Sequence, residues 1–203
     1  MTTASWNKGI QSRDEQRRIK KLAILETASR LFNERGYDRT SIEDIAAQLH
    51  VSKRTLYYYI DSKEEILFEC DKYGLEYLND AIADSVIPGQ PALQRFEALL
   101  RAYMSLLSTN FGACLVLSRE YYLSEKSREI LRQGRRNLDL RARSLIEEGI
   151  ADGSITPCDP ATATAAIFGA LNWVPHWRKT GNEADYLRLA DDFLAIFLNG
   201  LAK

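Results

Sequence analysis

Three helix-start signals follow one another closely near the beginning of this sequence, and their spacing restricts how the segment can fold. In Thr40-Ser41-Ile42-Glu43, the Thr40 hydroxyl is a cap candidate and Glu43 follows three residues later, which is the pattern of a capping box. Ser52 is a second N-cap candidate, and Asp61-Ser62-Lys63-Glu64-Glu65 holds a third cap with a glutamate three residues on. Helices that begin this close together are short and are joined by tight turns.

Apolar residues at helical spacing support the same helices. A first amphipathic helix ends at Gly36, a residue suited to the left-handed conformation that terminates helices. The stripes of the first two helices are Leu22, Leu25, Ala28, Leu31 and Phe32, then Ile42, Ile45, Ala46 and Leu49. Two short helices joined by a turn of three or four residues form a helix-turn-helix, whose second helix enters the DNA major groove with its N-terminal residues leading. Lys53 and Arg54 stand at that leading end, where the helix dipole disfavours cations, so DNA explains their presence better.

Charge is distributed unevenly along the chain. The formal net charge is -1, but residues 1–63 hold 12 basic and 8 acidic side chains, whereas residues 64–203 hold 15 and 20. A basic first third beside an acidic remainder indicates that only the first part meets a polyanion, although solvated helices also show such imbalances.

The segment from Thr40 to Leu67 closely resembles the signature of the tetracycline-repressor (TetR) family, and the likeness covers roughly residues 18 to 68. The resemblance implies a three-helix DNA-binding head that leads into a long fourth helix. It implies base contacts for the start of the third helix, phosphate or sugar contacts for two tyrosines, and phosphate contacts for a lysine and two caps. The residues that match the base-contacting positions are Lys53, Arg54 and Thr55. Tyr57 and Tyr58 match the phosphate- or sugar-contacting tyrosines. Lys63 matches the phosphate-binding lysine, and Thr40 and Ser41 match the caps that contact phosphate. A tyrosine run at helical spacing also suits packing, which is the interpretation for Tyr59, and Ile45 and Leu56 are expected in the core.

The remaining two thirds are helical by periodicity, so the fold class expected is all-α: a helix-turn-helix head followed by a helical ligand-binding and dimerisation domain. We expect a flexible arm over 1–17, the head over 18–64 and the second domain over 65–203. The arm either reaches a minor groove or is disordered. The helices expected in the second domain are 63–85, 91–109, 113–123, 125–150, 159–178 and 183–200, with breaks that include Gly112 and the stretch from Gly149 to Pro160.

The last two expected helices carry small residues on one and an apolar stripe on the other. The resemblance implies that these helices form a symmetric four-helix interface with a second copy, so a homodimer is expected on a palindromic operator. The interface residues expected are Ala166, Ala170, Trp177, Leu189, Phe193 and Phe197.

The stretch from Phe168 to Arg178 is similar to one found in TetR-type regulators that answer to acyl-coenzyme A thioesters, and Arg119–Tyr122 supports this loosely. Arginines at 132, 135, 136, 141 and 143 suit coenzyme A phosphates, although arginines on a long helix are more often a solvated face. His176 suits a ligand contact or a structural role. The pocket residues expected are Tyr103, Leu107, Phe111, Arg119, Tyr122, Phe168, Asn172 and Trp173.

These features predict a repressor that binds double-stranded operator DNA and is released by a small-molecule effector. The alternatives are a multidrug-type regulator of an efflux gene, and a DNA-binding protein or activator without effector control. Enzyme motifs such as G-x-x-x-x-G-K-[ST], G-x-G-x-x-G, G-x-S-x-G and H-E-x-x-H are absent from the sequence, and no cofactor is expected. Three separated cysteines and two histidines support neither a disulfide framework nor a metal site. With no secretory signal and no apolar run long enough to span a membrane, a cytoplasmic location is expected.

Overall fold

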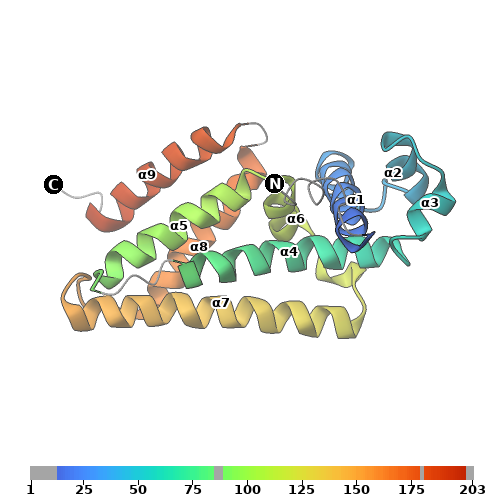
Figure 1. Cartoon of the computed structure of the whole chain (residues 1–203). Coiled ribbons are helices and arrows are strands. Elements are labelled where there is room, and N and C mark those ends of the chain that lie inside the picture. Colours follow the sequence, from blue (N-terminus) through green and yellow to red (C-terminus); the bar gives the residue numbers. More distant parts are fainter. Residues whose placement is uncertain (1–12, 85–88, 179–180, 200–203) are drawn as a thin grey trace, which may run out of the picture.

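The computed structural model describes residues 13–84, 89–178 and 181–199, and every regular element within these ranges is helical (Figure 1). The helices are α1 (Arg13–Arg35), α2 (Ile42–Gln48), α3 (Lys53–Tyr57), α4 (Lys63–Asp84), α5 (Ala92–Leu107), α6 (Asn110–Leu117), the 3-10 turn η2 (Glu120–Tyr122), α7 (Glu125–Asp152), α8 (Pro160–Trp177) and α9 (Glu183–Asn199). The all-α class expected from the sequence is confirmed.

The head consists of α1, α2 and α3, packed at one end of α4 (Figure 1). Its core contains Ala28, Leu31 and Ile45 of the expected apolar stripes, together with Leu56 and Ile60, and all five residues are almost fully buried. The helix α4 continues from the head into the second layer without a break, so the boundary after residue 64 stays a prediction. Of the expected arm, residues 1–12 lie outside the described residues and residues 13–17 are already helical, because Arg13–Arg17 form the first turns of α1.

The caps of the short helices differ from the expectation by one residue. The N-cap of α2 is Ser41, whose hydroxyl accepts from the Asp44 amide at 3.1 Å while the Asp44 carboxylate accepts from the Ser41 amide at 2.8 Å. The capping box therefore uses Ser41 and Asp44, and the expected pair Thr40 and Glu43 is wrong. Thr40 is buried, and its hydroxyl donates to the Leu31 and Gly36 carbonyls, which ties the loop to the end of α1. Ser52 caps α3 as expected.

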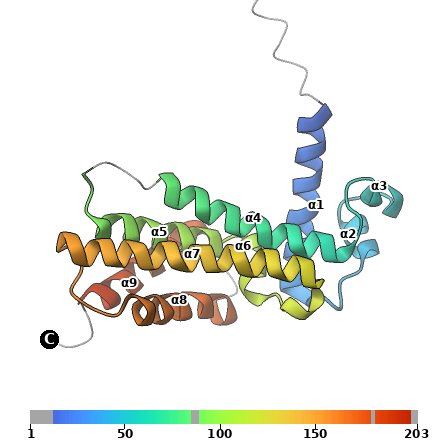
Figure 2. The same cartoon turned by 90° about the horizontal axis from the view of Figure 1, so that it is seen from below.

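In the second domain, which we also call the second layer, α4, α5 and α7 lie along one another, α8 packs on α7, and α9 packs on α5 (Figure 2). One expected helix, 113–123, is wrong: α6 covers Asn110–Leu117, and the chain then turns through η2. Gly112 is a helical residue rather than a break, because Thr109 caps α6 by accepting from the Gly112 amide at 3.1 Å. Gly149 is also helical, and α7 ends only at Asp152, where Gly153 adopts a positive φ of 77°.

Within the described residues no single helix is long and apolar enough to cross a membrane. Only α5 and α6 taken together have the length and the apolar composition of a membrane span, and the two helices are bent by 94° relative to each other. The same part of the chain holds no group of three potential metal ligands. Cys70 and Cys114 are buried free thiols, and Cys158 is an exposed one.

Candidate functional site

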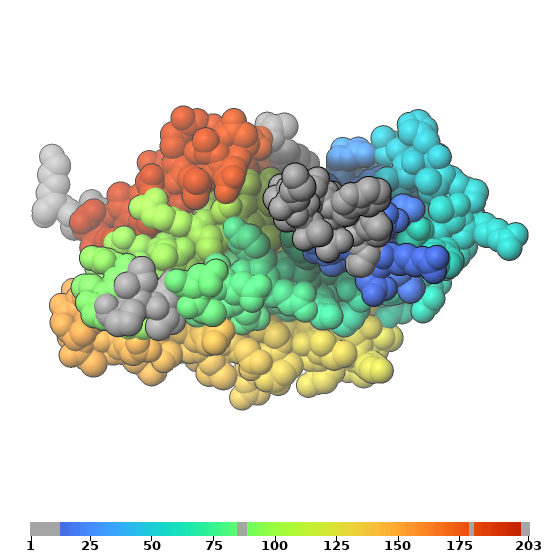
Figure 3. Space-filling model, in the orientation of Figure 1, coloured from blue at the N-terminus to red at the C-terminus, as the bar shows by residue number. Residues whose placement is uncertain are grey.

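The outward face of α3 is polar and aromatic, whereas its inner side is anchored in the head. Leu56 at its centre is fully buried, and this single anchor turns the other side chains of the short helix toward solvent. The exposed residues are Lys53, Arg54, Thr55, Tyr57 and Tyr58, with 69% of Tyr58 exposed. The α2–α3 region forms one end of the molecule in Figure 3, away from α5 and α9. Such a protruding face is accessible to a large, extended partner.

The cationic side chains near this face have internal partners in the free protein. Lys53 forms an ion pair with Glu43, and its ammonium lies 5.7 Å from the centre of the Tyr57 ring. Lys63 points toward the head, donating to the Tyr37 carbonyl at 2.8 Å, and desolvation by burial lowers its pKa. Both lysines would exchange these partners to reach a phosphate. Arg17 lies over the Tyr58 ring at 5.7 Å, so the start of α1 borders the same face.

The eight residues expected to contact DNA are not equally placed. Six are exposed or half-exposed on or near the α3 face, namely Ser41, Lys53, Arg54, Thr55, Tyr57 and Tyr58. Lys63 faces inward, and Thr40 is 1% exposed with its hydroxyl donated to two carbonyls. We therefore remove Thr40 from the proposed interface, because burial leaves its side chain no surface to offer.

A cavity of about 660 Å³ lies in the second layer between α4, α5, α6, α7 and α8. Four of the eight expected pocket residues line it: Tyr103, Phe168, Asn172 and Trp173. The Tyr103 hydroxyl donates to the Asn172 side chain, its ring lies 5.1 Å from that of Phe168, and burial raises its pKa. Trp173 stacks on His176 at 4.4 Å, and His176 also lines the cavity.

The other four expected pocket residues lie elsewhere in the structure. Leu107 is buried and lines a separate cavity of about 540 Å³, and Phe111 packs on Tyr73 at 4.5 Å. Arg119 and Tyr122 line a third cavity, of about 320 Å³, between η2 and the end of α1. The turn after Leu117 directs this segment toward the head, so Tyr122 stacks on Tyr37 at 4.3 Å instead of facing the main cavity.

A buried carboxyl group lies beside the main cavity. Asp71 on α4 is fully buried; it accepts from the Ser118 hydroxyl at 3.0 Å, and one of its oxygens lies 3.4 Å from Arg135. Desolvation raises the pKa of Asp71 to about 7, although Arg135 and Ser118 act in the opposite direction. Asp71 therefore changes its charge near neutral pH.

The arginines of α7 behave mostly as a paired surface. Arg132 binds Glu120 and Glu125, Arg143 binds Asp139 at 2.7 Å, and Arg136 and Arg141 are exposed. Only Arg135 of this group lines the main cavity.

The sequence pattern did not single out the apolar residues that line the main cavity, since they resemble ordinary core positions. These residues are Leu75, Leu115, Val116 and Leu138.

The residues expected at the dimer interface are divided between surface and core. Ala166 is exposed, Ala170 is half-buried and 52% of Trp177 is exposed. Leu189, Phe193 and Phe197 are partly buried against the core of their own chain. Trp173, Ile196 and Leu198 add further exposed apolar surface on α8 and α9. The interface itself stays a prediction.

A helix-turn-helix head joined by one long helix to a helical domain with its own cavity is typical of one-component transcription regulators, in which the same chain binds DNA and a ligand. Comparison with known proteins agrees: residues 24–70 match the pattern of the bacterial regulatory proteins of the tetR family, and residues 89–201 match the tetracyclin repressor-like C-terminal domain. The chain therefore belongs to the TetR family, and it is a helix-turn-helix transcriptional repressor.

Three similar proteins illustrate the relationship. The fatty acid metabolism regulator protein of Bacillus subtilis (strain 168) is 25% identical over 194 residues, which cover 92% of this chain and 98% of that protein. The TetR-family regulator PfmR of Thermus thermophilus is 29% identical, with a TM-score of 0.76 over 89% of this chain and 99% of PfmR. AibR, solved with isovaleryl coenzyme A and operator DNA, has a TM-score of 0.73 at 24% identity over 88% of this chain and 98% of AibR, and shares the fold.

Proposed function

We propose that the chain binds a palindromic DNA operator as a homodimer in the cytoplasm and leaves it when a small molecule fills the cavity of about 660 Å³. The observation that carries the DNA-binding part is the exposed face of α3, where Arg54, Thr55 and Tyr57 surround one buried leucine. A two-fold dimer presents two such helices to half-sites about one turn of DNA apart. The exposed tryptophans and aliphatic residues of α8 and α9 support the homodimer, since an apolar surface of this kind favours burial.

For the effector, we propose an acyl compound, with coenzyme A thioesters as the first candidates. Support comes from the apolar lining by Leu115, Leu138 and Phe168, and from the relative named as a regulator of fatty acid metabolism. The fold of AibR accommodates isovaleryl coenzyme A and DNA together. The cavity is about as large as typical small-molecule sites, so it takes part of the thioester while the rest of the molecule extends outward.

A cationic aromatic effector is the second candidate, since carboxylates of Glu120 and Asp139 and the aromatic pair Trp173 and His176 line the same cavity. Thermal shift measurements with decanoyl-coenzyme A and with ethidium distinguish the two candidates, because a ligand that binds only the folded state raises the melting temperature. If neither compound stabilises the protein or weakens its binding to operator DNA, the effector part of the proposal is wrong.

Replacing Arg54 with alanine should weaken operator binding by about 1–3 kcal/mol and relax the preference at one base pair, because an arginine at this position reads base edges. Replacing Lys63 with methionine should weaken binding to all sequences alike and reduce its salt dependence, as expected for a phosphate contact. Fluorescence anisotropy with the palindrome nearest the gene, and with single-base variants of it, measures both effects.

Lys72→Ala is the control for these two variants. Lys72 is a half-exposed lysine on α4 that pairs with Glu76 at 3.5 Å, so its removal changes the net charge by the same amount. If Arg54→Ala and Lys63→Met behave like Lys72→Ala, the α3 face is not the DNA-binding surface.

A further inference from the structure

We propose that Arg135 binds a negatively charged group of the effector and that Glu120 is the protein group which this anion replaces. The inference rests on the proposed function, because it names the chemistry of the ligand that fills the cavity. Among the described residues that line the cavity, Arg135 is the only arginine or lysine. Its side chain is 33% exposed, so its guanidinium is accessible from the cavity and yet partly desolvated. A partly desolvated guanidinium binds carboxylates and phosphates strongly.

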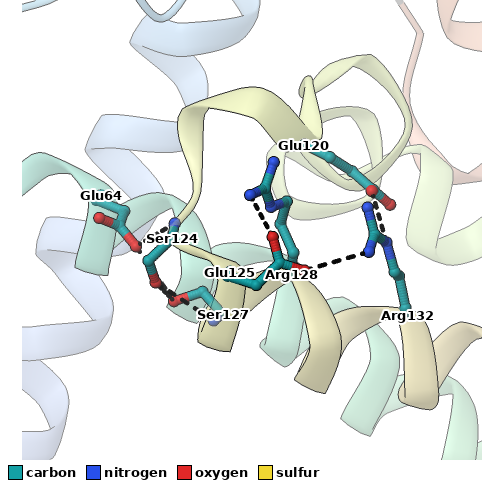
Figure 4. Close-up of polar contacts among 7 residues, drawn as sticks. All are labelled: Glu64, Glu120, Ser124, Glu125, Ser127, Arg128 and Arg132. Atoms are coloured by element: carbon teal, nitrogen blue, oxygen red, sulfur yellow. Dashed lines mark hydrogen bonds and ion pairs between the residues drawn. The ribbon is translucent and has the colours of Figure 1, made fainter.

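Glu120 bridges two arginines through different oxygens. Its Oε1 accepts from Nη1 of Arg135 at 2.8 Å, and its Oε2 accepts from Nε of Arg132 at 3.0 Å. Figure 4 shows Glu120 facing Arg132, which also lies beside Glu125. When an anion takes Arg135, Glu120 therefore keeps Arg132 as its partner. The exchange leaves no charge unpaired, so it avoids the large cost of an isolated charge in a partly buried site.

The surroundings of Arg135 define the rest of the ligand. Leu138 lies on the same helix, and Leu75, Leu115 and Phe168 complete an apolar wall of the cavity. The hydroxyl of Tyr103 is engaged by Asn172, so this polar group is satisfied within the protein. The site suits an apolar chain that carries one anionic group, either the carboxylate of a fatty acid or a phosphate of its coenzyme A ester.

The segment from Arg119 to Ser124, which we call the η2 clasp, joins this site to the head. Two residues after Glu120, Tyr122 donates its hydroxyl to Asp38 and stacks on Tyr37 of the head. The Ser124 amide donates at 2.8 Å to Glu64, which lies in the first turn of α4 and is seen beside Ser124 and Ser127 in Figure 4. Glu120 thus belongs to a segment that contacts the head on one side and α4 on the other.

The test uses calorimetric titration of the full-length protein with decanoate, decanoyl-coenzyme A and the uncharged 1-decanol. Arg135→Met should weaken binding of the anionic probes by about tenfold or more, since it removes a charge-assisted contact. Glu120→Gln should tighten their binding by about threefold or more, because the competing carboxylate has lost its charge. Arg136→Met is the matched control, because Arg136 is an exposed arginine on the same helix that does not line the cavity. It should change binding of the anions by less than about threefold, and 1-decanol should bind all variants alike.

Several results would overturn the assignment: no binding of either anion to the wild type, unchanged binding to Arg135→Met, or no tightening in Glu120→Gln. A gain of affinity cannot come from a folding defect, so Glu120→Gln remains decisive if Arg135→Met is unstable. Binding of decanoate supports a carboxylate at Arg135, and binding of decanoyl-coenzyme A alone supports a phosphate.

Operator binding, measured in parallel, separates this inference from the proposed function. If decanoyl-coenzyme A releases operator DNA equally from the wild type and from Arg135→Met, the Arg135 assignment is wrong and the proposed function stands. If binding depends on Arg135 but leaves DNA affinity unchanged, the assignment stands and effector-controlled repression is wrong.

Discussion

At pH 8, the Asp71→Asn variant should resist urea better than the wild type, and this advantage should shrink toward pH 4. Asp71 is fully buried, and desolvation raises its pKa from 3.8 to about 7. A change of this size corresponds to roughly 4 kcal/mol between the folded and unfolded states. Asparagine has nearly the same shape and carries no charge, and Arg135 retains Glu120 at 2.8 Å in the variant.

The sign follows from proton binding. Because the pKa of Asp71 is higher in the folded state, the folded chain holds more protons than the unfolded chain between about pH 4 and pH 7. The free energy of unfolding of the wild type therefore falls as the pH rises through this window and is constant, for this group, above it. Asp71→Asn lacks this loss of stability. The difference in the free energy of unfolding between the variant and the wild type therefore grows from pH 4 to pH 7 and then levels off.

Urea unfolding at pH 5, 6, 7 and 8 measures this difference. Asp80→Asn is the control, since Asp80 lies exposed on the same helix and its replacement should leave the pH dependence of the wild type unchanged. A difference between Asp71→Asn and the wild type that stays constant across the four pH values would show that Asp71 is ionised throughout, contrary to its burial.

Gly112→Ala should lower the free energy of unfolding by about 3 kcal/mol or more, the upper range for overpacking. A Cβ at position 112 would lie 2.1 Å from the Leu106 carbonyl oxygen and 2.4 Å from its carbon. These are backbone atoms at the end of α5, so they cannot move aside without opening the 94° corner between α5 and α6. Thermal unfolding followed by circular dichroism measures the loss.

Gly74→Ala on α4 is the matched control for this variant. There the added Cβ would meet the Cδ2 atom of Leu115 at 3.2 Å, and a side-chain methyl can shift by a few tenths of an ångström. Its cost should stay below about 1 kcal/mol, since alanine also favours the helix. If both variants lost the same free energy of unfolding, the contact of the added Cβ with the Leu106 backbone would not be what excludes alanine at position 112.

The order and type of the helices were predictable because they depend on local signals. The apolar stripes that include Ala28, Leu31 and Ile45 are buried as expected, and the cap at Ser52 is where the sequence indicated it. The first capping box was misplaced by one residue, since Thr40-Ser41 followed by Glu43-Asp44 allows two registers. Long-range contacts of the Thr40 hydroxyl with Leu31 and Gly36 select between them.

The candidate site was predictable only in part. Tyr103, Phe168, Asn172 and Trp173 do line the cavity, whereas Arg119 and Tyr122 turn toward the head because α6 ends at Leu117. Which arginine of α7 would face the cavity depends on the rotation of a long helix against its neighbours, and an arginine-rich sequence does not specify that rotation.

The sequence by itself determined the helix-turn-helix within residues 40–67 and the all-α class, because caps and apolar periodicity act over one or two helical turns. Tertiary structure alone decided that Lys63 points at Tyr37, that Asp71 is buried with a pKa of about 7, and that Glu120 bridges Arg132 and Arg135. Each of these features joins residues from different helices, and its energy depends on the distance and solvent exclusion that packing creates.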